Sequence, residues 1–279
     1  MRWSRGAAAL LGGLVALALL AGTRILPRAA AELGQRGHER LLVVGVPLWL
    51  PPFGAPGRAG GWVGLDVEIA RQTAGVLLGN PARARLLPLE PGERLWTLEH
   101  GGANMVSAAY VAPSSQATPP GMRLIGPYLS SPVALLVPRG QPLRSWAQLD
   151  GRELGVLGGE DRLRTLAGPA VHFLAEPLDA PGLAASQLAL GRFRAVVGPL
   201  PVLTALARYD PALSVQRDAA LGDERFWVLV PAADLALAQA VSRALALLPR
   251  GAAMDAALMT WTAEASGPPA LLTLPGGGA

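Results

Sequence analysis

The stretch Gly126–Gly140, with the sequence GPYLSSPVALLVPRG, indicates how the chain is organised. Its second part, SPVALLVPRG, is a run of apolar residues that ends at a proline and a glycine, which is typical of an extended buried segment. Patterns of alternating strands and helices lie on both sides of it. We therefore expect this segment to be an extended connection between two α/β lobes.

Apolar runs of strand length alternate with amphipathic runs of helix length on each side of this connection. Before it, strands are expected at 40–50, 83–90 and 104–110, and helices at 61–79 and 92–101. After it, the alternation restarts at residue 143, with helices expected at 160–168, 180–191 and 199–209 and strands at 170–176 and 193–198. This order predicts mostly parallel sheets that are flanked by helices on both faces.

A second apolar run, ERFWVLVP at 224–231, is expected to lead back to the first lobe, which amphipathic helices at 233–248 and 251–261 would complete. The organisation that we predict is a signal peptide at 1–31, a discontinuous first lobe at 32–134 and 226–262, a second lobe at 135–225, and a flexible tail at 263–279 that is rich in Gly and Pro.

The first 31 residues have the pattern of a secretory signal peptide. Two arginines in the first five residues precede an apolar stretch over 7–21, and three small residues follow at 29–31. The apolar stretch is shorter than the roughly 20 residues that a spanning helix needs. We therefore expect export to the periplasm with cleavage, and an uncleaved N-terminal anchor is the alternative because two more arginines lie between the apolar stretch and the alanines.

Composition argues against several classes of function. All 24 basic residues are arginine, and four of them lie in residues 1–31, so the rest of the chain has 20 basic and 20 acidic residues. This balance gives no reason to expect a nucleic-acid partner. The chain has no cysteine, so we expect its core alone to hold it together outside the cytoplasm.

No motif predicts catalysis, a metal or a cofactor. The histidines His38, His100 and His172 are far apart and lack the spacing of metal ligands. Without lysine there is no phosphate-binding Gly-Lys-Ser/Thr loop, the glycine-rich stretches lack the dinucleotide fingerprint, and a G-x-S-x-G nucleophile motif is missing. We therefore expect a protein that is not an enzyme and that has no cofactor.

A series of short motifs follows one another in a familiar order and spacing. They are VGVPLWLPPF, GLDVEIA, LEHGGANMVSAA, GPYLSSPVALLVPRG, LRSWAQLDGRELGVLGG, LALGRFRAVVGP and GAAMDAALMTW. Together they resemble the bacterial extracytoplasmic solute-binding proteins of the polar amino-acid uptake family, over residues 40–262. The resemblance implies the type II periplasmic-binding fold, in which two α/β lobes are joined by two extended crossings and a small ligand binds in the cleft between them.

The resemblance also implies which residues line the first lobe's side of the cleft. Phe53 follows the end of the first strand, where open α/β sheets place their ligands. The aromatic residue that stacks on the ligand in the family corresponds to Leu50, with Trp49 beside it. Asp66 falls at the start of the next helix, and we expect it to cap that helix.

One wall of the cleft departs from the family's pattern, because the stretch AAYVAPSSQATPP at 108–120 lacks the charge that binds an amino acid. The family's hydroxyl-bearing positions correspond to Ala108, Ala109 and Val111, with Tyr110 among them. Its arginine, which binds the ligand carboxylate with two hydrogen bonds, corresponds to Gln116. Gln116 can donate hydrogen bonds but supplies no charge, so a buried carboxylate would be costly to hold.

The second lobe departs in the same direction. Where the family has Gly followed by Ser or Thr at a helix start, this chain has Gly159, Glu160 and Asp161, whose acids would repel an anion. The family's acidic partner of the ligand ammonium corresponds to Pro199. Both charged ends of an α-amino acid have therefore lost their expected partners.

Three functions remain open on these grounds. The first is a solute-binding protein of a transport or sensing system, with an inner-membrane permease or sensor as its partner and a small polar or neutral solute, other than a standard α-amino acid, as its ligand. The second is an accessory or interaction protein that has lost small-ligand binding. The third is an enzyme that resembles periplasmic dehydratases, which has little support because the sequence places no acid/base pair.

Overall fold

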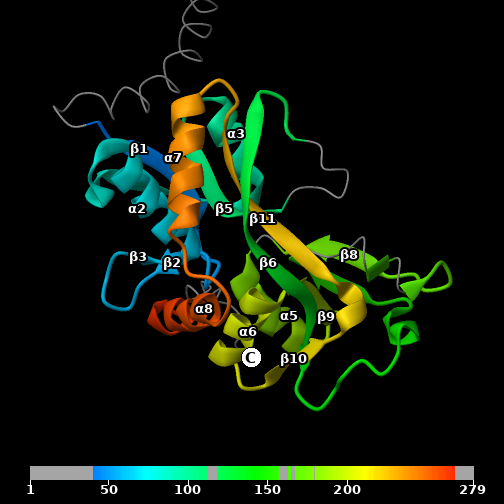
Figure 1. The fold of residues 1–279 in the computed structure, drawn as a ribbon. Helices are drawn as coiled ribbons and strands as arrows, with labels where there is room; N and C mark the ends of the chain where they lie inside the picture. The colour runs from blue at the N-terminus through cyan, green and yellow to red at the C-terminus, as the bar shows by residue number, and fades with distance from the viewer. Residues whose placement is uncertain (1–39, 112–117, 158–162, 165–166, 179, 268–279) are drawn as a thin grey trace, which may run out of the picture.

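The structure, a computed structural model, describes residues 40–111, 118–157, 163–164, 167–178 and 180–267. Its longest strand is β6 (Met122–Pro138), which passes from one lobe to the other, and β11 (Asp223–Pro231) runs beside it in the opposite direction. Figure 1 shows these two strands crossing together between two groups of strands and helices. They are the two extended crossings that the sequence predicted.

The first lobe is built on the parallel strands β4, β1 and β5, and β11 and β6 extend its sheet by antiparallel pairing. Helices α2 and α7 pack side by side against one face of the sheet, and α3 packs against the other. The bounds of these elements are β1 (Leu42–Pro47), α2 (Leu65–Leu78), β4 (Ala84–Leu89), α3 (Arg94–Glu99), β5 (Met105–Val111) and α7 (Leu235–Ala246). Two short strands, β2 (Ala55–Pro56) and β3 (Trp62–Val63), form a separate hairpin.

The second lobe repeats this design around the C-terminal half of β6. Strands β8, β7 and β9 are parallel to one another, whereas β9 and β10 pair antiparallel with β6. The bounds are β7 (Glu153–Val156), β8 (Leu174–Pro177), α5 (Ala184–Ala189), β9 (Phe193–Pro199), α6 (Leu200–Tyr209) and β10 (Leu213–Arg217). Short 3-10 turns precede or link these elements at Pro81–Arg83, Pro91–Glu93, Trp146–Leu149, Pro181–Leu183 and Ala219–Leu221.

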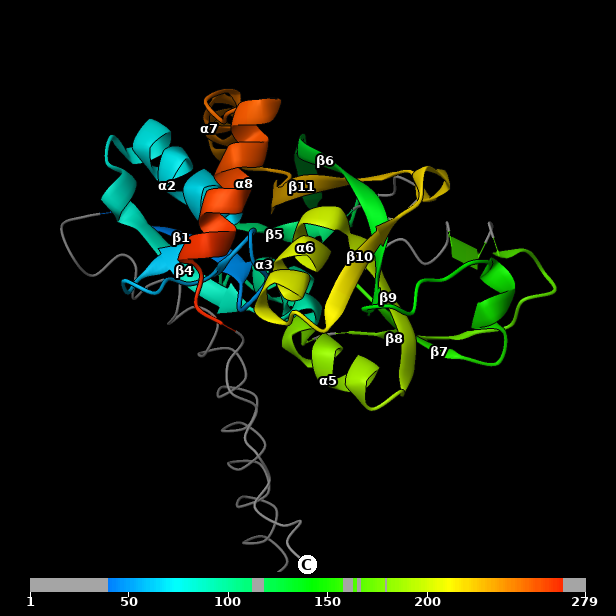
Figure 2. The ribbon, with the colours of Figure 1, turned by 90° about the horizontal axis from the view of Figure 1, so that it is seen from below.

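Helix α8 (Ala252–Glu264) lies next to α6 of the second lobe in both ribbon views. Figure 2 shows it between α2 and α6. Its buried residues Met254 and Leu258 join a core that includes residues of both lobes. The last helix is thus placed where the two lobes meet.

The fold class predicted from the sequence is confirmed: two α/β lobes of mostly parallel strands are joined by two extended strands. The strand β10 was missed, because its residues LSVQR give no continuous apolar run. The exact lobe boundaries, 134/135 and 225/226, stay predictions, since β6 and β11 run through both lobes without a break. The predicted helix 160–168 and the signal peptide at 1–31 fall wholly or partly outside the described residues.

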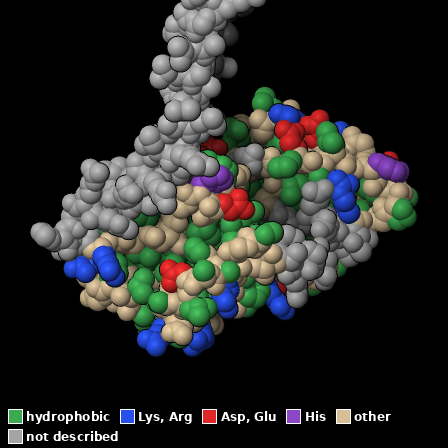
Figure 3. All heavy atoms as spheres, turned by 90° about the horizontal axis from the view of Figure 1, so that it is seen from above, with side chains coloured by type: hydrophobic (Ala, Val, Ile, Leu, Met, Phe, Trp, Pro, Cys, Tyr) green, Lys and Arg blue, Asp and Glu red, His purple; other side chains and the backbone are tan. Residues whose placement is uncertain are grey.

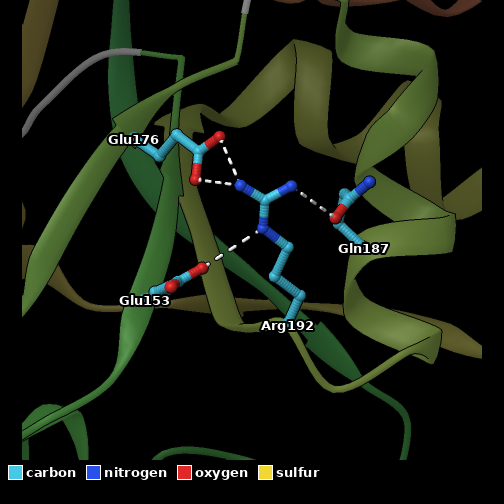
Figure 4. Close-up of polar contacts among 4 residues, drawn as sticks. All are labelled: Glu153, Glu176, Gln187 and Arg192. Atoms are coloured by element: carbon cyan, nitrogen blue, oxygen red, sulfur yellow. Dashed lines mark hydrogen bonds and ion pairs between the residues drawn. The ribbon is translucent and has the colours of Figure 1, made fainter.

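An arginine joins the outer strands of the second lobe to a helix (Figure 4). Arg192 donates from Nη2 to both carboxylate oxygens of Glu176 on β8, each at 2.7 Å, and from Nε to Glu153 on β7 at 3.2 Å. Its Nη1 donates to Gln187 of α5 at 3.4 Å. Because the group is solvent-exposed, its role is to fix the local arrangement of strand and helix rather than to add much stability.

The surface of the described residues has no uniform charge on the face shown in Figure 3, where arginines and acids are interspersed with apolar side chains. On this face the distribution agrees with the equal numbers of basic and acidic residues beyond residue 31. Within the described ranges, no helix combines the length and the apolar character needed to cross a membrane.

Candidate functional site: a cavity between the lobes

The carboxyl ends of six parallel strands from the two lobes meet at one cavity. The cavity has a volume of about 600 Å³. The last residues of β1, β4 and β5 line it from the first lobe, and the last residues of β7, β8 and β9 line it from the second. Ligands bind outside the carboxyl ends of strands in open α/β sheets, because the loops there are free to vary. The topology therefore places one candidate site between the lobes.

Most of the cavity's lining is apolar. The lining residues are Pro47, Leu48, Trp49, Leu50, Phe53, Pro56, Leu89, Glu90, Pro91, Arg94, Ala109, Val111, Val156, Leu157, Pro177, Leu178, Ala180, Pro181, Gly182, Leu183, Pro199, Val202, Phe226, Ser266 and Gly267.

Six of the residues predicted from the sequence lie together in this lining: Trp49, Leu50, Phe53, Ala109, Val111 and Pro199. Tyr110 does not, because successive side chains of a strand point to opposite faces, and Tyr110 packs with Ala108 in the core under α3. The remaining predicted residues, Gln116, Gly159, Glu160 and Asp161, lie outside the described residues.

Asp66 does not cap α2, so that expectation was wrong. The N-cap residue is Gly64, and the carboxylate of Asp66 instead points across to β5. It accepts hydrogen bonds from Ser107 Oγ and from the backbone N–H of Ala109, each at 2.8 Å. An Asp near a helix start can either cap the helix or be buried beneath it, and the sequence pattern is the same in both cases. Only the packing of α2 on β5 shows that Asp66 is buried.

Through Ala109, Asp66 shapes the wall of the cavity. Ala109 has a φ of 50°, a left-handed conformation that costs a non-glycine residue on the order of 1 kcal/mol or more. The hydrogen bond to Asp66 holds this conformation, and the pairing of β5 with β11 is irregular just opposite, between Trp227 and Leu229. The strand therefore bends where it reaches the cavity.

Burial controls the ionisation of this carboxyl group. Complete burial raises the pKa of Asp66 from 3.8 to about 6, although Tyr128, Ser107, the Ala109 N–H and the charge of Arg94 all act to lower it. Burial also raises the pKa of Tyr128 well above its usual value, and the nearby charge of Asp66 raises it further. A buried acid and a buried phenol thus lie close together behind the first-lobe wall, and the charge of Arg94, which lines the cavity, acts on both.

The sequence did not point to Glu90 and Arg94, the charged side chains in the described part of the lining. Both follow the end of β4, and Arg94 is the first residue of α3. A Glu and an Arg four residues apart at a helix start are ordinary for an exposed surface. Only the position of the β4–α3 connection beside the strand ends brings them to the cavity.

The described wall of the second lobe contains no polar or charged side chain. Strand ends contribute Val156, Leu157 and Pro199, and the segment from Pro177 to Leu183 supplies further apolar groups in its described part. Sequence reasoning predicted only Pro199 of these. The missed residues carry no motif, but three prolines at 177, 181 and 199 mark where the chain turns at the strand ends.

The residues that follow α8 complete the cavity. Ser266 and Gly267 line it, and the backbone oxygen of Ser266 accepts a hydrogen bond of 3.3 Å from Trp49 Nε1. The sequence predicted a flexible tail from residue 263 onward. In the structure Ala265, within that predicted tail, is 1% exposed and forms an isolated bridge with Gly57. Within the described residues, no group of three or more His, Cys, Asp or Glu is placed to hold a metal ion.

Comparisons with known proteins relate this chain to a class of binding proteins. No family model matches the chain. A putative amino-acid ABC transporter-binding protein of Escherichia coli (strain K12), YhdW, is 26% identical over 133 residues, which are 48% of this chain and 39% of that protein. The chain therefore matches less than half of that relative's length.

Solved structures match over much more of the chain. An ancestral arginine-binding protein bound to glutamine has a TM-score of 0.65 and 24% identity, and the match covers 79% of this chain and 97% of that one. The amino-acid ABC transporter substrate-binding protein AbpA from Streptococcus pneumoniae, bound to L-arginine, has a TM-score of 0.67 and 19% identity over 80% of this chain and 94% of that one. The chain has the type II periplasmic-binding fold, and it is similar in sequence to amino-acid-binding proteins of ABC transporters.

Proposed function

We propose that the protein is a periplasmic solute-binding protein that delivers a small solute to the permease of an ABC transporter in the inner membrane. The observation that carries the proposal is the cavity of about 600 Å³ at the meeting point of six strand ends. Its volume lies in the range of small-molecule sites, about 300 to 1,000 Å³. The similarity to amino-acid ABC transporter-binding proteins supports a permease as the partner and gives no support to a sensor.

The ligand that we propose is mainly apolar and is not a standard α-amino acid. A bound zwitterion loses water at both its carboxylate and its ammonium group, and each needs a charged or strongly polar partner in return. The side chains of the described second-lobe wall are all apolar. The charged side chains among the described lining, Glu90 and Arg94, both belong to the first lobe. A solute with an apolar body and one small polar end fits this distribution.

Binding by the cavity, rather than catalysis, is the better reading of its chemistry. Asp66, Ser107 and Tyr128 lie behind the wall and are not part of the lining. Among the described lining residues, no acid and base lie on opposite walls of the cavity. The relatives are named as binding proteins of transporters, which supports a function other than that of an enzyme.

A screen of small solutes by thermal shift tests this function, because a ligand that binds only the folded state raises its stability by about 2.7 kcal/mol at 100 times the Kd. We expect stabilisation by neutral, largely apolar solutes and little or none by standard amino acids. Leu183→Trp, which adds a large side chain to the cavity wall, should abolish the shift. Leu190→Trp is the matched control, since Leu190 is 79% exposed and does not line the cavity.

Two outcomes would change the assignment. A Kd in the micromolar range or tighter for a standard amino acid, measured by calorimetry, would show that the first-lobe charges suffice for a zwitterion and that the proposed ligand class is wrong. Stabilisation by none of the amino acids, amines and neutral solutes in the screen would favour the accessory protein without a small ligand.

A further inference from the structure

The segment 262–267, which we call the C-terminal strap, contacts both lobes at the edge of the cavity. On the first-lobe side, the backbone N–H of Arg58 donates to Glu264 O at 2.9 Å, and Ser266 N–H donates to Pro56 O at 2.8 Å. The Arg58 side chain adds a bond from Nε to Ala265 O at 3.1 Å. These bonds attach the strap to the β2–β3 hairpin.

On the second-lobe side, one side chain of the described residues donates hydrogen bonds to the strap. Tyr209 is the last residue of α6, and its hydroxyl lies 3.2 Å from Thr262 O and 3.2 Å from Ala265 O. The hydroxyl has a single proton, so it is shared between the two carbonyl oxygens. Both acceptors lie at the C-terminal end of α8, where the helix itself leaves carbonyl groups without partners.

The same strap reaches the cavity. Ser266 and Gly267 line it, and Ser266 O accepts the hydrogen bond from the Trp49 indole. The rings of Trp49 and Tyr209 are tilted at 49° to one another, with centroids 5.9 Å apart. Tyr209 itself is not in the lining, although it contacts both the strap and the tryptophan.

We propose that Tyr209 is a positioning residue of the cavity: through the C-terminal strap it holds the two lobes in the arrangement in which both line one cavity, and it fixes Trp49 in the wall. β6 and β11 join the lobes covalently, but extended strands bend, so they do not by themselves set the angle between the lobes. The strap supplies a separate, non-covalent link that must break before the lobes separate. The proposal rests on the proposed function for its importance to binding, but the link itself exists without ligand.

The perturbation that tests the link is Tyr209→Phe, which keeps the ring and removes the hydroxyl. We expect the population with separated lobes to rise about fivefold in the ligand-free protein, which corresponds to the loss of one net hydrogen bond of about 1 kcal/mol. Arg58→Met removes one of three bonds on the other side of the strap and should give a smaller rise in the same direction. Breaking either attachment should therefore separate the lobes.

The distance between the lobes is measured by pulsed electron paramagnetic resonance on spin labels. The chain has no cysteine, so labels attach only at Leu77→Cys in the first lobe and Leu190→Cys in the second, both exposed positions. Tyr110→Phe is the matched control, because it removes the same atom from a tyrosine on the opposite side of β5, away from the strap. Circular dichroism confirms that each labelled variant is folded, so that a longer distance reports lobe separation and not unfolding.

The expected result is a short distance that dominates in the ligand-free wild type and in Tyr110→Phe, with a second, longer distance in Tyr209→Phe and Arg58→Met. Identical distances in all four proteins, or a long distance that already dominates in the wild type, would overturn the proposal. An equal rise in Tyr110→Phe would do the same. None of these readouts needs a ligand, so failure of the solute screen and failure of the strap are separate results.

Discussion

Replacement of Asp66 by asparagine should change the pH dependence of stability in a defined direction. Asp66 is completely buried, and its burial raises the pKa to about 6 from 3.8. Between these two pH values the folded protein holds a proton that the unfolded chain releases. Stability therefore falls as the pH rises through this window, which is opposite to the behaviour of a carboxylate held by a salt bridge.

The size of this effect follows from the shift in pKa. The two pKa values differ by about 2.2, and each pKa unit corresponds to roughly 1.36 kcal/mol. Protonated Asp66 therefore contributes about 3 kcal/mol to the free energy of unfolding below pH 4, and this contribution is lost by about pH 6. Asparagine cannot be ionised, so the Asp66→Asn variant should not lose this stability as the pH rises from 4 to 6. It also cannot accept both the Ser107 hydroxyl and the Ala109 N–H, which costs about 1 to 3 kcal/mol at every pH.

Urea denaturation from pH 4 to pH 8 measures the difference between the two proteins. Asp66→Asn should be less stable than the wild type at pH 4 and of similar or greater stability at pH 7. Thr73→Val is the matched control, because Thr73 is buried on the same helix, cannot titrate, and has a hydroxyl without a hydrogen-bond partner in the described structure. Its difference from the wild type should be the same at every pH. A pH-independent difference for Asp66→Asn as well would refute the reasoning.

Two further predictions concern the scaffold. Gly64→Ala should destabilise the fold by at least about 2 kcal/mol in the same assay, because φ is 134° and the added Cβ would lie 2.3 Å from Phe53 O. Gly79→Ala is the control: φ is 73° and the space around it is open, so it should cost only about 1 kcal/mol. Equal losses of stability in the two variants would contradict the steric argument. Glu176→Gln should lower Tm slightly at low salt, because it removes the charge that pairs with Arg192. The pair is exposed, so the difference in Tm from the wild type should disappear in 1 M NaCl. A difference in Tm that persists in high salt would show that the pair stabilises the fold by more than its charge.

Much of the architecture could be predicted from local patterns. The apolar run before Pro47 is buried as β1, and the periodic run that ends at Gly79 is α2, whose C-cap glycine has a left-handed conformation. The run through Pro132 is β6, the crossing between the lobes. These features depend on the periodicity of apolar residues and on the positions of glycine and proline, and both can be recognised within a short stretch of sequence.

The site was predictable only in part. The turn after β1 was identified because it lies at the carboxyl end of a strand, where open α/β sheets place ligands. The end of β5 was identified from the resemblance to the solute-binding family. Arg94 and Glu90 were missed because nothing local distinguishes a helix start that faces solvent from one that faces a cleft. The role of Asp66 was misread for the same reason, since its partners are 41 and 43 residues away in the sequence.

The sequence by itself determined most of the order of strands and helices, though not β10, and the two-lobed α/β design, because the side chains that specify an element lie within it. Tertiary structure alone decided which face of β5 meets the cavity, that the second-lobe wall is apolar where it is described, and that Tyr209 reaches the strap 53 residues away. These features arise where segments distant in the chain are packed together. Their free energies depend on burial and on partners that no single segment contains.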